Sequence, residues 1–71
     1  MNREEVVSTV LKSVGYEPDT QILEIEFQSG DVYQYFDVPQ DVVAALLNAD
    51  SKGTYFNDSI RDAYPTEKLD G

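Results

Sequence analysis

The chain has 71 residues, of which 41% are hydrophobic and 27% charged, as in an ordinary folded domain. Its 14 acidic residues against 5 basic ones give a net charge of -9, which repels phosphate backbones and anionic membranes and favours a basic partner. The chain contains neither cysteine nor histidine, which excludes disulfides, cysteine-based zinc sites and the side chain best suited to acid–base catalysis near neutral pH. A domain this small buries only about 60% of the surface of its unfolded chain, so we expect large apolar residues to serve the core.

The N-terminal segment fits either a helix or a strand. Five apolar residues share one helical stripe: Val6, Val7, Val10, Leu11 and Val14. The run VVSTV, however, is rich in β-branched residues, and Val10, Val14 and Tyr16 also follow the period of a strand. We favour a strand over residues 10–16, preceded by a loose or briefly helical segment over residues 1–7.

Neither a secretory signal nor a membrane span is evident in the sequence. Acidic residues occupy positions 4 and 5, and no apolar run approaches the roughly 20 residues that cross a bilayer. Small secreted domains usually rely on disulfides, which this chain cannot form. We therefore expect a cytoplasmic protein that does not bind membranes.

Two further strands follow the N-terminal one. EPDTQ, residues 17–21, predicts a turn, because proline and aspartate both favour turn conformations. ILEIEF, residues 22–27, alternates, so its apolar side chains face one way while Glu24 and Glu26 face water and serve solubility. After a second turn, DVYQYFDV at residues 31–38 completes a three-stranded antiparallel meander.

The second turn decides whether Tyr33 and Tyr35 lie in the core. If QSG is a three-residue loop with Gly30 at positive φ, both tyrosines stand opposite the apolar residues of the preceding strand and share their core face. If the loop has two residues, both tyrosines turn to solvent and Gln34 turns inward. We favour the first alternative, because burying a glutamine without a partner costs more than half-exposing Phe36. The tyrosines are then core residues whose hydroxyls reach the rim.

Two helices are predicted after the strands. Pro39 starts the first helix. Its apolar face comprises Val42, Val43, Leu46, Leu47 and Ala49. Gly53 permits a sharp reversal, and TYFNDSIRDAY, residues 54–64, forms the second helix, which Pro65 terminates.

The predicted fold is therefore α+β: a three-stranded antiparallel β-meander followed by two α-helices packed on one face. We expect a single domain over residues 8–65 and a fraying tail over residues 66–71.

The chain resembles the KTSC domain family in three segments: VGYEPDTQILEIEF, GDVYQYFDVP and ADSKGTYFNDSIRDAY. The signature is Tyr-x-Tyr, here Tyr33 and Tyr35, followed by Val38-Pro39. A second pattern, Ser-x-Gly-x-x-Phe-Asn-x-x-Ile-Arg, is matched by Ser51, Gly53, Phe56, Asn57, Ile60 and Arg61.

This resemblance runs from about Ser8 to Tyr64 and implies a strand before Tyr16. The family is named for an extension at the C-terminus of some lysyl-tRNA synthetases, and it also includes small free-standing bacterial proteins. RNA binding has been suggested for it, partly because of that association, although its function is not established. The acidity of this chain departs from the suggestion.

RNA binding needs cations for phosphates and aromatic rings for bases. On this hypothesis Lys12, Lys52 and Arg61 form a patch around Tyr33 and Tyr35, where stacking contributes ~1–3 kcal/mol per base. We favour the alternative that these three cations pair with neighbouring acids.

Asn57 and Arg61 stand four residues apart and therefore share one face of the predicted second helix. They are either a polar pair offered to a ligand or structural residues. We favour the structural alternative, in which Asn57 bonds the backbone of the preceding loop and Arg61 pairs with Asp58 or with an acid on the sheet. Ser51 is expected to cap the helix.

No catalytic or metal-binding pattern is found. The serines have no evident base. An EF-hand register started at Asn48 places Lys52 at a ligand position and Ser59 where the bidentate glutamate belongs, so it fails. We expect neither catalysis, nor metal, nor cofactor.

The leading hypothesis is a small non-catalytic binding module for RNA or an RNA-associated protein. Its candidate site residues are Tyr33, Tyr35, Lys52, Asn57 and Arg61. The rival hypothesis is an acidic protein-interaction domain that binds a basic partner and avoids nucleic acid.

Overall fold

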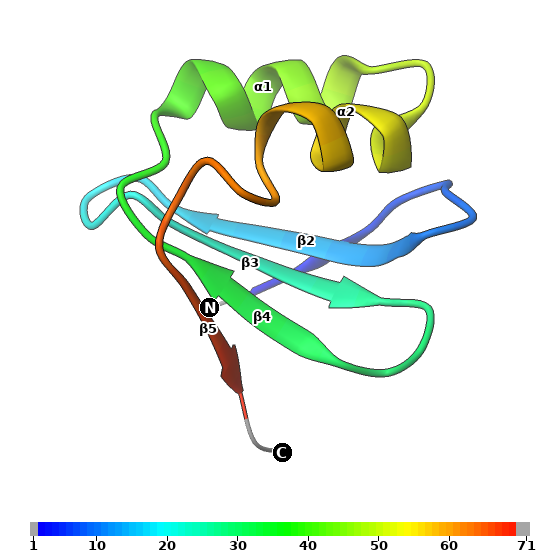
Figure 1. Cartoon of the computed structure of the whole chain (residues 1–71), viewed down its shortest axis with the longest axis horizontal. Helices are drawn as coiled ribbons and strands as arrows, with labels where there is room; N and C mark the ends of the chain where they lie inside the picture. The colour runs from blue at the N-terminus through cyan, green and yellow to red at the C-terminus, as the bar shows by residue number, and fades with distance from the viewer. Residues whose placement is uncertain (1, 70–71) are drawn as a thin grey trace.

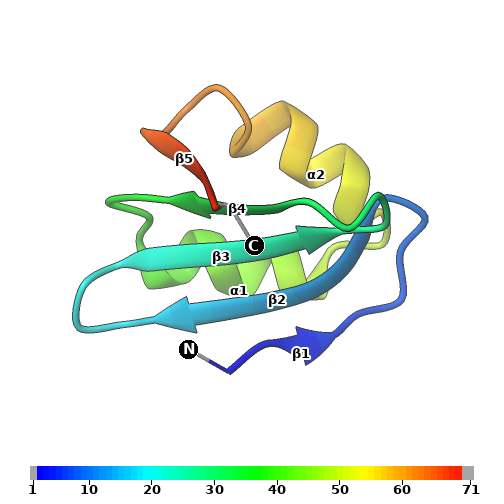
Figure 2. The ribbon, with the colours of Figure 1, turned by 90° about the horizontal axis from the view of Figure 1, so that it is seen from below.

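Five strands form one antiparallel sheet in the computed structural model, which describes residues 2–69 (Figure 1). The strands lie in chain order: β1 (Glu4–Glu5), β2 (Leu11–Glu17), β3 (Ile22–Phe27), β4 (Val32–Tyr35) and β5 (Thr66–Leu69). Between β4 and β5 the chain forms α1 (Gln40–Asn48) and α2 (Lys52–Ser59), and both helices cover the same face of the sheet (Figures 1 and 2). The predicted α+β class and antiparallel meander are confirmed.

The prediction of three strands was wrong, because each edge of the meander gains a strand. At one edge β1 pairs with β2, in place of the loose or helical segment expected there. At the other edge β5 pairs along β4, from Val32 with Leu69 to Tyr35 with Thr66. The tail predicted over residues 66–71 is therefore a strand as far as Leu69, and residues 70–71 lie outside the described part of the chain.

The strand predicted over residues 10–16 is present as β2, but a β-bulge changes which residues it buries. The pairing of β2 with β3 shifts between Leu11 and Ser13, so that Lys12 is the extra residue. Leu11 and Val14 both face the core as a result, while Val10 is 38% exposed. Because the bulge places Leu11 and Val14, three residues apart, on the same face, the segment matches a helical spacing although it is a strand.

The β3–β4 hairpin has the three-residue loop that we favoured. Gly30 has a φ of 96°, and the Phe27 N–H donates to the carbonyl of Asp31 at 2.9 Å. Tyr33 therefore stands opposite Ile25, and Tyr35 stands opposite Leu23. The prediction that the tyrosines share the core face is confirmed.

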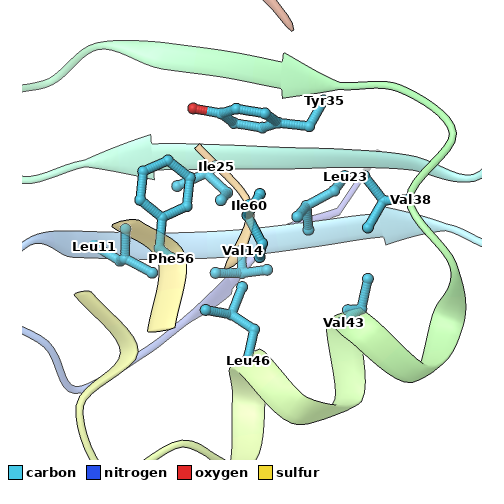
Figure 3. Close-up of a cluster of buried hydrophobic side chains, with 10 residues drawn as sticks. All are labelled: Leu11, Val14, Leu23, Ile25, Tyr35, Val38, Val43, Leu46, Phe56 and Ile60. Atoms are coloured by element: carbon cyan, nitrogen blue, oxygen red, sulfur yellow. The ribbon is translucent and has the colours of Figure 1, made fainter. Parts of the chain in front are cut away.

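The core lies between this face of the sheet and the helices (Figure 3). It consists of Leu11, Val14, Leu23, Ile25, Tyr35, Val38, Val43, Leu46, Phe56 and Ile60. From α1 only Val43 and Leu46 are fully inside among the described residues, whereas Leu47, placed on the apolar face by the sequence, is 39% exposed.

The second helix begins and ends earlier than predicted. It covers Lys52–Ser59, and Ser51 caps it as expected by accepting a hydrogen bond from the Thr54 N–H at 3.3 Å. The helix ends before Ile60, which is fully buried, so the following residues turn back toward the sheet. Tyr64 also precedes a proline, a position that disfavours helix.

Gly53 does not form the predicted reversal, because it lies inside α2. It is buried, and a Cβ atom at this position would stand 2.8 Å from Cγ2 of Val10. Glycine is thus needed because α2 approaches the loop before β2 closely.

The outer face of the sheet carries a hydrogen-bonded ionic network. Glu24, predicted to be a solubilising charge, is instead only 7% exposed. It forms an ion pair with Arg3 at 2.5 Å and accepts a hydrogen bond from Gln34 at 3.0 Å, while Arg3 also donates to Ser13. β1 brings Arg3 over this face, which compensates the buried carboxylate.

The described part of the chain contains no helix that is long and apolar enough to cross a membrane.

Candidate functional site

A groove of about 890 Å³ opens where α2 and the turn after it meet β4 and β5. Aromatic residues from β3, β4, α2 and the turn after α2 line it, and we call it the aromatic groove: Phe27, Tyr33, Tyr35, Phe56 and Tyr64. The loop before β2, the hairpin between β3 and β4 and the start of β5 complete its walls.

Four of these rings pack edge to face in a continuous row. Phe27 contacts Tyr33 with ring centroids 5.6 Å apart and Phe56 with centroids 5.3 Å apart. Tyr35 contacts Phe56 at 5.4 Å with an interplanar angle of 79°. Such contacts favour a defined ring geometry, so the floor of the groove is preorganised.

Tyr35 belongs to both the core and the groove. Its side chain is only 3% exposed, and its hydroxyl makes no hydrogen bond within residues 2–69. Since no buried polar side-chain atom of the described residues lacks a partner, the hydroxyl must reach the groove surface. Burial, with smaller contributions from Tyr33 and Asp62, raises the pKa of Tyr35 to about 12 against the opposing effect of Arg61. The hydroxyl is therefore a neutral hydrogen-bonding group at physiological pH.

Charged and polar side chains form the rim of the groove. Asp31 comes from the β3–β4 hairpin, Asn57 from α2, and Arg61 and Asp62 from the turn after α2. All four are exposed. Asp31 forms an ion pair with Lys68 at 3.6 Å.

The structural roles predicted for Asn57 and Arg61 were wrong. Within residues 2–69 the Arg61 side chain makes no ion pair, and the Asn57 side chain makes no hydrogen bond. Because α2 ends at Ser59, Arg61 lies beyond the helix, where its backbone N–H donates to the Phe56 carbonyl at 2.9 Å. Both side chains are thus available to a ligand at the groove rim.

Four of the five residues singled out in the sequence meet at the groove: Tyr33, Tyr35, Asn57 and Arg61. Lys52 lies outside it, and its ammonium donates to the Ala49 carbonyl at 3.3 Å. The expected pairing of Lys12 and Lys52 with acids is not formed within the described chain. The cationic patch of the RNA hypothesis is not formed either, because Arg61 is the single basic residue among the described groove residues.

Among the groove residues that were not candidates from the sequence, Asp31, Asp62 and Tyr64 supply the acidic rim and an additional ring. The sequence pattern places Asp31 at the start of a strand and the other two in a helix. A predicted helix end at Ile60, in place of Tyr64, would have indicated that the following residues fold back toward the sheet.

The groove offers apolar rings, neutral hydroxyls, an amide and charges of both signs. These groups suit the binding of an amphipathic ligand. Among the described residues no cluster of three or more acidic side chains is arranged to hold a metal ion.

The fold and groove together define a small α+β domain whose five-stranded sheet carries two helices on one face over the described residues. The KTSC domain family model matches residues 7–64. The chain belongs to the KTSC domain family, as the sequence motifs indicated.

Similar proteins include both free-standing domains and a large enzyme. An uncharacterised protein of Stutzerimonas stutzeri is 54% identical over 57 residues, which cover 80% of each chain. A lysine–tRNA ligase of Nostoc punctiforme is 49% identical over 61 residues, which cover 86% of this chain but 11% of the ligase. The crystal structure of a KTSC domain protein from Yersinia pestis superposes with a TM-score of 0.94 and 35% identity over 97% of each chain.

Proposed function

We propose that this chain is a non-catalytic protein-interaction module that binds a basic partner in the aromatic groove. The observation that carries the proposal is the composition of the groove. A preorganised row of rings is flanked by two carboxylates, Asp31 and Asp62, against one cation, Arg61. A partner segment with apolar and basic side chains complements this surface.

The charge of the chain supports a basic protein over RNA as the partner. Single-stranded RNA gains affinity through phosphate contacts, and each contact adds about -0.7 to the log–log salt slope. Among the described residues that line the groove, Arg61 alone supplies such a contact, while Arg3 is held by the buried carboxylate of Glu24 and Lys68 lies against Asp31. The net charge of -9 opposes the approach of a polyanion and steers a basic protein toward the chain.

RNA is the second candidate, and one arrangement favours it. Arg61 and Asn57 line the same groove as Tyr33, so that one site offers a ring for stacking on a base, a guanidinium for a phosphate and an amide for a base edge. The similarity to part of a lysine–tRNA ligase adds weight to this candidate. Stacking would contribute ~1–3 kcal/mol per base.

Site-specific photo-crosslinking tests the proposal. A photoreactive amino acid replaces Asn57 at the groove rim, and a control variant carries it at Ala44, which is exposed on α1 outside the groove. The variants are irradiated in lysate with and without ribonuclease. We expect a protein adduct from position 57 that survives ribonuclease and weakens with salt, and no such adduct from position 44. A ribonuclease-sensitive adduct would favour RNA, and equal labelling at both positions would contradict the groove as the site.

A further inference from the structure

The two carboxylates of the groove come from separate segments that face a common row of rings. Asp31 belongs to the β3–β4 hairpin, and Asp62 belongs to the turn after α2. Neither is buried. The groove therefore places negative charge on two walls around an aromatic floor.

Asp31 already holds a cation from its own chain. The Lys68 ammonium lies 3.6 Å from its carboxylate, and both side chains are about half exposed. Exposed pairs of this kind contribute little free energy, because water and salt screen them. An incoming cation can therefore exchange with Lys68 at little cost.

The rings add a second attraction for a cation. The face of an aromatic ring is electron-rich, and a Lys or Arg side chain packed over it is stabilised by its quadrupole. Tyr33 and Tyr64 are both partly exposed in the groove. The long methylene stem of a Lys or Arg side chain would cover these apolar rings while its charge stays at the rim.

Resting on the proposed function, we infer that the groove recognises a Lys or Arg side chain of the partner protein, packed on Tyr33 and Tyr64 and paired with Asp31 or Asp62. The charge complementarity between these carboxylates, in a chain of net charge -9, and a basic segment carries the inference. Arg61 at the rim and Lys68 on Asp31 are the like charges beside this position, and Arg61 is the one that lines the groove. Its effect on affinity therefore has opposite signs for a basic peptide and for an anionic ligand.

The test is an NMR titration of the isotopically labelled full chain with three probes. The probes are a short amidated peptide of alternating lysine and leucine, the same peptide with glutamate in place of lysine, and a single-stranded oligouridine. We expect the lysine peptide alone to shift the amide signals of Tyr33, Arg61 and Tyr64, and to bind less tightly at high salt.

Variants that neutralise one charge show whether that charge strengthens or weakens the binding of the lysine peptide. A unit charge about 7 Å away in water changes the affinity of a cation by roughly threefold. Asp62→Asn and Asp31→Asn should each weaken the lysine peptide by about this factor, and Arg61→Gln should tighten it by about the same factor. Asp58→Asn and Lys52→Gln make the same charge changes outside the groove and should have smaller effects.

The outcomes separate this inference from the proposed function. Tighter binding of the glutamate peptide or the oligouridine, or weaker binding of the lysine peptide by Arg61→Gln, would overturn the cationic occupant while the groove remained the binding site. Shifts confined to residues outside the groove would overturn both. Thermal melts check that every variant is folded.

Discussion

The ring of Tyr35 on β4 packs edge to face against the ring of Phe56 on α2, with centroids 5.4 Å apart. This contact joins the sheet to the second helix (Figure 3). The two rings also form part of the floor of the aromatic groove. The same side chains therefore stabilise the fold and shape the candidate binding surface.

Truncating Tyr35 should destabilise the fold strongly. Tyr35→Ala removes a buried ring, and deletions of this kind cost about 3–5 kcal/mol. A domain of this size has little more stability than that, so the variant should be largely unfolded. Tyr35→Phe is the matched control and should cost less than about 1 kcal/mol, because the hydroxyl has no partner within the described chain. Urea denaturation followed by circular dichroism measures both, and equal midpoints for the two variants would contradict the core role of the ring.

High pH should destabilise the protein through the same residue. The folded pKa of Tyr35 is about 12, above the ordinary value of 10.0, so the unfolded chain loses this proton first as pH rises. The contribution of the neutral phenol is fully present below pH 10 and is lost between about pH 10 and 12. The urea midpoint of the wild type should fall over this range, and that of Tyr35→Phe should fall less. Parallel losses in the two proteins would show that Tyr35 does not titrate as described.

The ion pair between Arg3 and Glu24 should contribute to stability despite its place near the N-terminus. Arg3→Ala leaves a buried carboxylate without its cation, and we expect a loss of about 1–3 kcal/mol. Glu24→Gln keeps the hydrogen bond with Gln34 on one oxygen. In a double-mutant cycle the two changes should couple by at least about 0.5 kcal/mol, as residues in direct contact do. Additive losses would mean that the pair does not stabilise the fold.

Gly53→Ala should be destabilising, although alanine is normally favoured over glycine in a helix by about 1 kcal/mol. The new Cβ atom would lie 2.8 Å from the side chain of Val10, and overpacking of this kind costs about 1–3 kcal/mol. Adding Val10→Ala should restore part of the stability, because it removes the 2.8 Å contact with Cγ2 and leaves a contact of 3.1 Å with Cβ. A stabilised single variant in thermal unfolding would refute the close approach of α2.

The central hairpin could be predicted because the local chemistry and the pattern agree. Gly30 supplies the positive φ of a three-residue loop, and the alternative loop would have buried Gln34. Ser51 was likewise identifiable as a cap from its type and position. In both cases a few adjacent residues determine the local structure.

The errors arose where tertiary contacts decide the structure. The strand β5 reads Thr-Glu-Lys-Leu, with no apolar alternation, and it is a strand because its backbone pairs with β4. The burial of Ile60 ends α2 early and sends Arg61, Asp62 and Tyr64 back over the sheet. The candidate site was thus found in part from Tyr33, Tyr35, Asn57 and Arg61, whereas its acidic rim depended on that turn.

Intermolecular nuclear Overhauser contacts with the lysine peptide show whether the aromatic groove is the partner-binding surface. We expect contacts from lysine methylene protons to the ring protons of Tyr33 and Tyr64. Contacts instead to Val32 and Leu69, which line a second depression next to Arg3 that shares Asp31 with the groove, would contradict this assignment.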